Sequence, residues 1–137
     1  MASILVVEDE DEIRAMLVEL LEEAGFEVVE AGTGDLASVV LQSMRGLDAL
    51  VTDVHMPGEL NGVALASLFR QRYPERPILY VTGNPSALRD VPMCRGKDAI
   101  LSKPYRLAAL IRALRSLLAA DSGAGDAARA EAKLVAV

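Results

Sequence analysis

The feature that most constrains the fold is a repeated alternation between a short apolar run and a stretch with helical periodicity. The first run, Ile4-Leu5-Val6-Val7, is continuous and mostly β-branched, which is typical of a strand buried on both faces of a parallel sheet. The other runs cover residues 26–30, 48–52, 77–81 and 99–102. Strands that alternate with helices in this way predict an α/β fold with a doubly wound, five-stranded parallel sheet.

Apolar residues at helical spacing follow the strands. The expected first helix has its stripe at Ile13, Met16, Leu17, Leu20 and Leu21, and Gly25 follows as a C-cap glycine would. The second stripe is Leu36, Val39, Val40 and Met44, the third includes Leu65, Leu68 and Phe69, and the last is Leu107, Leu110, Ile111, Leu114, Leu117 and Leu118. Pro85 and Pro92 leave room for barely two turns between them, so we expect the fourth helix to be short or irregular.

The length of 137 residues suggests one domain. We expect it to cover residues 1–120, with a mobile tail over 121–137. The single cysteine, Cys94, excludes a disulfide framework and Cys-cluster zinc sites, and the single histidine, His55, excludes multi-His metal sites. No apolar run approaches the ~20 residues of a membrane span, and no secretory signal is visible. We therefore expect a cytoplasmic protein without membrane insertion.

The net charge of −6 hides an uneven distribution. Residues 1–60 carry 14 acidic and 2 basic side chains, whereas residues 61–137 carry 6 acidic and 12 basic ones. This asymmetry predicts a polarised molecule. The acidic balance argues against direct nucleic-acid binding, which needs basic patches.

The informative residues are those just after each strand, because open parallel sheets bind ligands at the carboxyl ends of their strands. These positions hold Glu8 and Asp9, then Asp53, then Thr82, then Lys103. Three converging carboxylates would repel one another, and a hard, oxygen-binding cation such as Mg²⁺ would resolve that repulsion. The hydroxyl and the ammonium could then bind phosphoryl oxygens, so the set predicts phosphoryl transfer with one carboxylate as nucleophile.

At this point a family resemblance is visible. The chain resembles the receiver domain of two-component response regulators over about residues 4–119. The matching segments are Val6–Glu10, Val51–Gly58, Val81–Gly83 and Leu101–Tyr105, and each closes an expected strand. The resemblance implies a flavodoxin-like sheet with strand order 2-1-3-4-5.

The resemblance also implies a role for each acidic residue. Asp53 would accept a phosphoryl group from a phosphohistidine on a partner. Glu8, Asp9 and Asp53 would hold Mg²⁺, with the backbone carbonyl of His55 as a further ligand. The acidic run that begins at Glu8 could also be the solvated start of a helix, and we prefer this interpretation for residues 10–12.

The remaining strand-end residues would bind and sense the phosphoryl group. By resemblance, Thr82 binds a phosphoryl oxygen and moves on activation, and Lys103 pairs with the phosphoryl group or with Asp53. The Lys103-Pro104 peptide is typically cis in this family. Many receivers have a switch aromatic where this chain has Ile100, so we consider Tyr80 as its substitute.

Two side chains flank the expected phosphoryl position. His55 lies two residues beyond the expected nucleophile, and Asn84 lies two residues beyond Thr82. We hypothesise that they set the lifetime of the phosphoryl group.

The expected function is a stand-alone phosphoacceptor that switches protein contacts and is not a turnover enzyme. Its expected partners are a sensor histidine kinase or a histidine phosphotransfer protein and a downstream protein target, and a homodimer is a further hypothesis. A basic strip of Arg106, Arg112 and Arg115 could serve docking, although a solvated face is the default interpretation. Two alternatives stay open: an aspartate-nucleophile phosphatase, whose nucleophile should end the first strand, and a phosphate-insensitive binding module.

Overall fold

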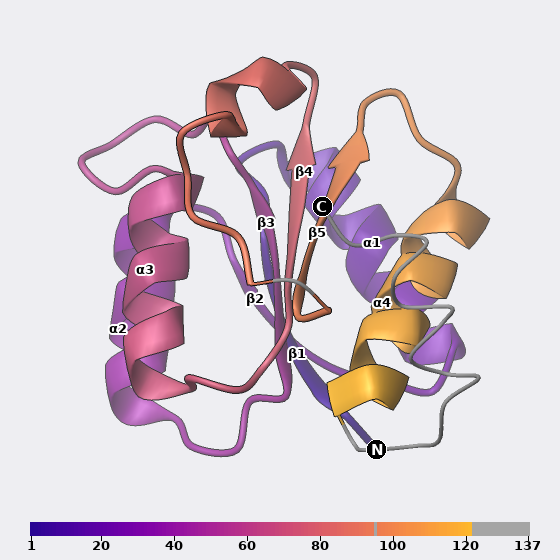
Figure 1. The fold of residues 1–137 in the computed structure, drawn as a ribbon. Helices are drawn as coiled ribbons and strands as arrows, with labels where there is room; N and C mark the ends of the chain where they lie inside the picture. The colour runs from indigo at the N-terminus through magenta and orange to yellow at the C-terminus, as the bar shows by residue number, and fades with distance from the viewer. Residues whose placement is uncertain (95, 122–137) are drawn as a thin grey trace.

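The structure, a computed structural model, describes residues 1–94 and 96–121. They form a parallel sheet with helices on both faces (Figure 1). The strands are β1 (Ser3–Val7), β2 (Glu27–Ala31), β3 (Ala49–Asp53), β4 (Ile78–Thr82) and β5 (Asp98–Ser102). The helices are α1 (Asp11–Glu23), α2 (Gly34–Ser43), α3 (Gly62–Arg72), the 3₁₀ helix η1 (Pro85–Leu88) and α4 (Leu107–Asp121).

The sheet has the strand order β2-β1-β3-β4-β5, and every neighbouring pair is parallel. This confirms the expected doubly wound sheet of order 2-1-3-4-5. Helices α1 and α4 cover one face, and α2 and α3 cover the other (Figure 1). All five carboxyl ends therefore lie along one edge of the sheet, at the top of Figure 1.

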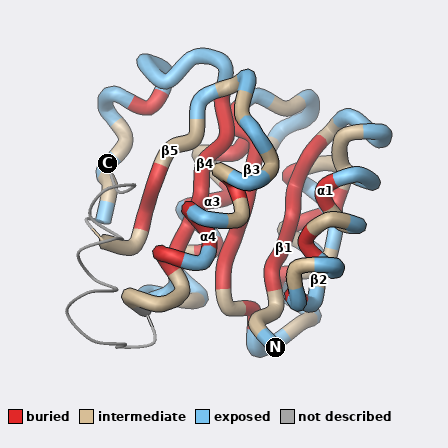
Figure 2. The backbone as a smooth tube through the Cα atoms, turned by 90° about the vertical axis from the view of Figure 1, so that its right-hand side faces the viewer, coloured by how far each residue is buried: buried red, intermediate tan, exposed pale blue. Residues whose placement is uncertain are grey.

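The core consists of two aliphatic layers separated by the sheet. Successive side chains of a strand point to opposite faces, so Ile4 and Val6 pack under α1 and α4, whereas Leu5 and Val7 pack under α2 and α3. All four are almost completely buried. Figure 2 shows the same result for the middle of the sheet: β1, β3 and β4 are buried along almost all of their length, whereas most of the edge strand β2 is exposed or half-buried. The continuous apolar sequence of β1 is thus explained by burial on both faces.

Three strands, β2, β3 and β4, each lie one residue further along the chain than the sequence predicts. We expected residues 26–30, but β2 covers Glu27–Ala31. Phe26 is apolar because it packs in the layer under α1 and α4, just before the strand begins. Gly25, in contrast, has the expected role: it follows α1 with a φ of 99°, a left-handed conformation that favours glycine.

Three of the expected helical stripes need correction, and in α3 the departure is Leu68, which is 36% exposed. In α2, Leu36 and Val39 are each 58% exposed, and the buried positions are Ala37 and Leu41. In α1, Met16 is 44% exposed, although it shares the helical spacing of the buried leucines. Alanine contributes little to a hydrophobic pattern but fits where a helix packs close to the sheet, so the pattern pointed to the wrong side of α2.

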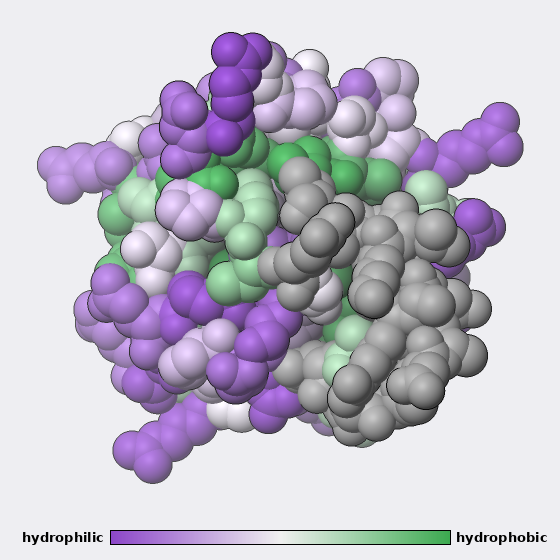
Figure 3. Space-filling model, in the orientation of Figure 1, coloured by the Kyte–Doolittle hydropathy of each residue, from purple (hydrophilic) through white to green (hydrophobic). Residues whose placement is uncertain are grey.

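The fourth helix is reduced to η1, as the two prolines predict. The chain after η1 runs in front of the sheet between α3 and β5 (Figure 1). In the same orientation, Figure 3 shows hydrophobic side chains grouped across the upper middle of this face. A groove of about 630 Å³ lies here, lined in part by Val63, Ile78 and Val91.

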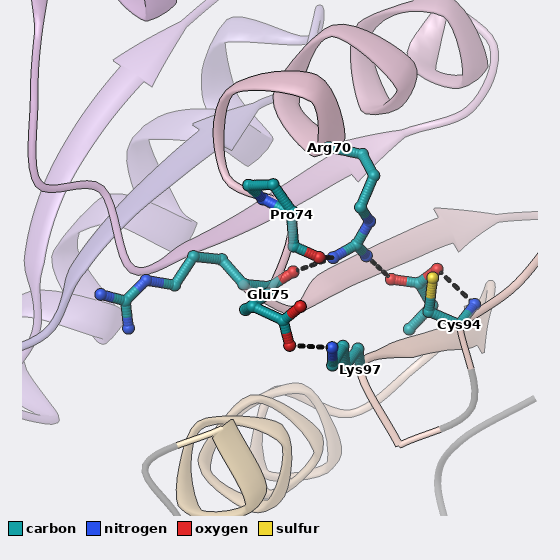
Figure 4. A network of polar contacts seen from close by, with 7 residues as sticks. Arg70, Pro74, Glu75, Cys94 and Lys97 are labelled. Atoms are coloured by element: carbon teal, nitrogen blue, oxygen red, sulfur yellow. Dashed lines mark hydrogen bonds and ion pairs between the residues drawn. The ribbon is translucent and has the colours of Figure 1, made fainter.

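Polar contacts fix the end of this segment (Figure 4). Arg70 of α3 forms an ion pair with the buried Asp98 of β5, and its guanidinium also donates to the carbonyl of Pro74. The backbone N–H of Cys94 donates to the other Asp98 oxygen at 2.9 Å. Lys97 pairs with Glu75. These contacts join the segment after η1 to α3 and β5.

The expected domain end at residue 120 falls in the last turn of α4. The expected tail lies outside the described residues from position 122 onward. Within residues 1–94 and 96–121, no helix combines the length and the apolar character needed to cross a membrane.

Candidate functional site: an acidic pocket with a lysine

The strand order brings the predicted site residues to one edge of the sheet. Asp53 is the last residue of β3 and Thr82 the last of β4. Glu8 and Asp9 directly follow β1, and Lys103 directly follows β5. Because β1, β3, β4 and β5 are consecutive neighbours in the sheet, all five residues lie around one position.

Three carboxylates converge in this pocket. One oxygen from each of Glu8, Asp9 and Asp53 lies within 4.8 Å of the others. Glu8 and Asp53 are only 3% and 7% exposed, while Asp9 is more open to solvent. Burial, with the negative charge of Asp53 as the second cause, raises the pKa of Glu8 from 4.5 to about 7. The ionised form of Glu8 is therefore disfavoured in this pocket, mainly because the side chain is buried.

These residues fit a divalent cation. Receiver-type acidic pockets bind Mg²⁺, and Mg²⁺ prefers carboxylate oxygens and water over nitrogen or sulfur ligands. The three oxygens are close enough to share one ion, and burial together with the charge of Asp53 makes an ionised Glu8 unfavourable without a counter-charge. The predicted acidic cluster is thus assembled as expected.

Lys103 supplies the nearest protein cation. Its Nζ donates to Oδ2 of Asp53 at 3.0 Å. Burial alone would lower the pKa of Lys103, but the hydrogen bond to Asp53 and the charge of that carboxylate outweigh it and raise the pKa. The backbone N–H of Lys103 also donates to the carbonyl of Thr82 at 2.8 Å, and the Lys103-Pro104 peptide is cis, as the resemblance implies.

Thr82 is fully buried, and its hydroxyl has one partner on the loop that follows. The backbone N–H of Asn84 donates to Oγ1 of Thr82 at 3.0 Å. A hydroxyl has one donor and two acceptor lone pairs, so this contact leaves its proton available for another oxygen. The position is suitable for binding a group carried by Asp53 on the neighbouring strand.

The two predicted tuning residues lie at the exposed rim. The His55 side chain is exposed and borders a shallow depression with Met56 and Pro57. Asn84 is exposed as well, and its Oδ1 accepts a hydrogen bond from Ser86 at 2.5 Å. Both residues are in the loops that directly follow β3 and β4. Their role in setting the lifetime of the phosphoryl group stays a prediction.

Tyr80 and Ile100 are direct cross-strand neighbours on β4 and β5. Tyr80 is buried in the layer under α2 and α3, on the same strand face as Thr82. Burial, followed by the charge of Asp98, raises the pKa of the Tyr80 phenol to about 12. Many receivers have an aromatic residue at the β5 position that Ile100 occupies here. In this chain the aromatic ring of Tyr80 lies next to that position, on the neighbouring strand β4.

Sequence reasoning missed two residues that shape the pocket. A Cβ added to Gly62 would lie 2.0 Å from the backbone oxygen of Asp53, so the start of α3 packs directly against the pocket strand. Arg14 donates to the backbone carbonyl of Glu8 at 2.9 Å. The sequence offered only a weak signal for Arg14, as the first basic residue after five consecutive acidic ones.

Comparison with known proteins gives the same result as the geometry. Residues 4–115 match the family model of the response regulator receiver domain. The chain is 33% identical over 121 residues to the response regulator receiver protein CpdR of Brucella abortus, covering 88% of this chain and 99% of CpdR. It is 34% identical over 119 residues to the transcriptional regulatory protein CpxR of Escherichia coli, covering 86% of this chain but 50% of CpxR.

The fold comparison agrees as well. The crystal structure of a response regulator receiver protein from Sinorhizobium medicae superposes with a TM-score of 0.80 and 30% sequence identity. The match covers 88% of this chain and 96% of that one. The chain belongs to the response regulator receiver domain family of two-component signalling.

Proposed function

We propose that the chain is a phosphoacceptor that takes a phosphoryl group onto Asp53 from a phosphohistidine on a partner and then changes its protein contacts. Members of the family are generally signalling modules rather than enzymes. The observation that carries the proposal is the convergence of three carboxylate oxygens within 4.8 Å beside the 3.0 Å contact between Lys103 and Asp53. We expect this reaction to take place in the cytoplasm.

Each residue of the pocket has a task in this reaction. A carboxylate oxygen of Asp53 attacks the phosphorus, and the bond between phosphorus and the histidine nitrogen breaks. Glu8, Asp9, Asp53 and the backbone carbonyl of His55 would hold Mg²⁺, which would supply positive charge against the phosphoryl oxygens when bound. Lys103 provides a positive charge next to Asp53, and its contact with Asp53 orients the nucleophile.

Thr82 would couple phosphorylation of Asp53 to a conformational change. Its buried hydroxyl can donate to a phosphoryl oxygen, and this would draw the end of β4 towards Asp53. Tyr80 lies two residues away on the same strand face, and Ile100 is its cross-strand neighbour. We propose that these two side chains repack when Thr82 moves, with Tyr80 in the role of the aromatic switch.

His55 and Asn84 are proposed to set the lifetime of the phosphoryl group. Their exposed side chains are in the two loops from which water would approach. The decay of acid-labile phosphate in His55→Ala and Asn84→Ala proteins tests this role, and we expect a changed half-life in at least one of them. Unchanged decay in both would contradict it.

A shallow apolar groove beside Lys103 is the proposed docking site for the phosphohistidine partner. It has a volume of about 530 Å³ and is lined in part by Ile13, Met16, Tyr105 and Leu107. This interpretation accounts for the exposure of Met16, because a partner helix would cover its side chain.

The basic strip on the last helix is smaller than the sequence predicts. Arg115 is engaged within the chain: it donates to the carbonyl of Ala24 at 2.9 Å, and its guanidinium lies over the Phe26 ring. Arg106 and Arg112 are exposed and stay candidates for contact with a kinase or a histidine phosphotransfer protein. A downstream protein target and a homodimer also stay predictions.

Incubation with acetyl phosphate tests the proposal. With Mg²⁺ we expect an intact mass increased by one phosphoryl group, and no increase with excess EDTA or in the Asp53→Asn protein. Absence of the adduct at saturating Mg²⁺ would favour the phosphate-insensitive binding module. Continued turnover of para-nitrophenyl phosphate would instead favour the phosphatase, although the candidate nucleophile ends β3 and not β1.

A further inference from the structure

Arg14 connects three elements behind the acidic pocket. Its Nη1 donates to the backbone carbonyl of Glu8 at 2.9 Å, its Nε to Oε1 of Glu30 at 3.1 Å, and its Nη2 to Oδ1 of Asp11 at 2.7 Å. These partners belong to the end of β1, to β2 and to the first turn of α1, respectively. One planar guanidinium thus uses three of its nitrogens on three different segments.

The surroundings of Arg14 leave its end little freedom. The side chain is only 17% exposed, although it begins on the first turn of a surface helix. Gly32 lies directly against it, because a Cβ added there would be 2.8 Å from Nη1. The hydrogen bonds to Glu30 and Asp11, followed by the charges of these carboxylates, raise the pKa of Arg14 further, so it stays a cation under all ordinary conditions.

The contact with Glu8 bears directly on the metal ligands. Glu8 and Asp9 form the turn between β1 and α1, where both side chains must bend towards Asp53. α1 begins without a side-chain cap, so no capping hydrogen bond fixes the start of this helix. The guanidinium instead holds the turn through the Glu8 carbonyl, next to the backbone hydrogen bond that the Glu8 N–H donates to Ala31 of β2 at 3.2 Å.

We propose that Arg14 is a positioning residue for Mg²⁺: it fixes the turn that carries Glu8 and Asp9 and thereby keeps their carboxylates preorganised around the ion. This inference rests on the Mg²⁺ site of the proposed function. Arg14 touches neither the ion nor the phosphoryl group, and it acts through the backbone of Glu8.

Geometry and charge would act in opposite directions here. As a cation near the pocket, Arg14 disfavours a second cation, so loss of its charge alone would tighten Mg²⁺ binding. Loss of its hydrogen bonds would loosen the turn and weaken binding. Arg14→Lys separates the two effects, because lysine keeps the positive charge but lacks the planar guanidinium whose nitrogens contact three partners.

The test measures Mg²⁺ affinity by titration calorimetry in the wild type, in Arg14→Lys and in the control Arg45→Lys. Arg45 is exposed and follows α2, at the opposite end of the sheet. For Arg14→Lys we expect about 3- to 10-fold weaker Mg²⁺ binding. We expect no change in the control.

Two further readouts separate positioning from a general loss of structure. In metal-free protein, hydrogen exchange at the amides of residues 9–11 should accelerate in Arg14→Lys, while amides of β3 and β4 keep their protection. With acetyl phosphate as donor, the Mg²⁺ concentration for half-maximal phosphorylation should rise, while the maximal rate stays the same.

Gly32→Ala perturbs the hydrogen bond between Arg14 and the Glu8 carbonyl without changing Arg14 itself. The added methyl group displaces Nη1 without removing the arginine. We expect Gly32→Ala to weaken Mg²⁺ binding in the wild-type background. It should have no further effect in Arg14→Lys, because both substitutions break the same contact.

The outcomes are distinguishable. If the wild type binds Mg²⁺ and Arg14→Lys binds it equally well, the inference about Arg14 is wrong while the proposed function stands. Additive effects of the two substitutions, or a drop in the maximal rate alone, would also overturn it. If the wild type does not bind Mg²⁺, the proposed function itself fails.

Discussion

Replacing Glu8 by glutamine should make the metal-free protein more stable, and only at neutral and alkaline pH. Glu8 is almost completely buried, and its pKa is raised from 4.5 to about 7 by burial and by the charge of Asp53. Ionised Glu8 is therefore better tolerated in the unfolded chain than in the folded one. Glutamine has nearly the same shape but no charge, and its oxygen can still accept from the backbone N–H of Glu10.

The sign and the size follow from proton linkage. Between pH 4.5 and about 7, the folded protein keeps a proton on Glu8 that the unfolded chain has lost. Stability therefore falls as pH rises through this window. Each pKa unit corresponds to about 1.4 kcal/mol, so the wild type loses at most about 3 kcal/mol by pH 8. Glu8→Gln does not undergo this loss.

Urea unfolding with EDTA at pH 5, 6, 7 and 8 measures the effect. Far-UV circular dichroism is the suitable probe, because the chain has no tryptophan. We expect similar stabilities of wild type and Glu8→Gln at pH 5, and a growing advantage of the variant up to pH 8. The exposed Glu23→Gln serves as the control, with an effect within about 0.5 kcal/mol at every pH.

Addition of Mg²⁺ completes the experiment. The ion supplies the charge that ionised Glu8 needs, so it should stabilise the wild type strongly at pH 8 and the variant only weakly. A stability difference between the two proteins that does not change with pH would refute the argument from burial and charge.

Four further substitutions test the packing of the fold, all by urea unfolding at pH 7. Arg70→Met leaves a buried carboxylate on β5 without its partner and should cost about 3 kcal/mol; a loss below about 1 kcal/mol would contradict this. Gly62→Ala should cost about 2 kcal/mol or more, because its Cβ meets the Asp53 backbone, and wild-type stability would exclude that contact. Leu114→Ala should cost about 2–5 kcal/mol and Leu36→Ala less than about 0.5; equal losses would contradict their burial.

The sheet and the pocket were predictable from the sequence because both depend on local order. An apolar strand such as β1 is recognisable from four residues, and its carboxyl end follows directly in the sequence. Once the strands are parallel neighbours, the residues after them must meet at one edge. Glu8, Asp53 and Lys103 were therefore identified without knowledge of any contact between them.

What the sequence did not show depends on contacts between distant segments. The hydrogen bond from Arg14 to the carbonyl of Glu8 and the ion pair of Arg70 with Asp98 leave no periodic pattern. The buried side of α2 was misjudged because Ala37 fills a tight position that exposed Leu36 could not. Such features follow from shape and distance in the folded chain.

The position of the phosphoryl group tests the central claim most directly. After reaction with acetyl phosphate and Mg²⁺, borohydride reduces an aspartyl phosphate to homoserine, and peptide mass spectrometry then identifies the modified residue. The account predicts homoserine at position 53 and at no other aspartate. Homoserine at Asp9 or another aspartate, or an unmodified Asp53 in protein that carries phosphate, would contradict it.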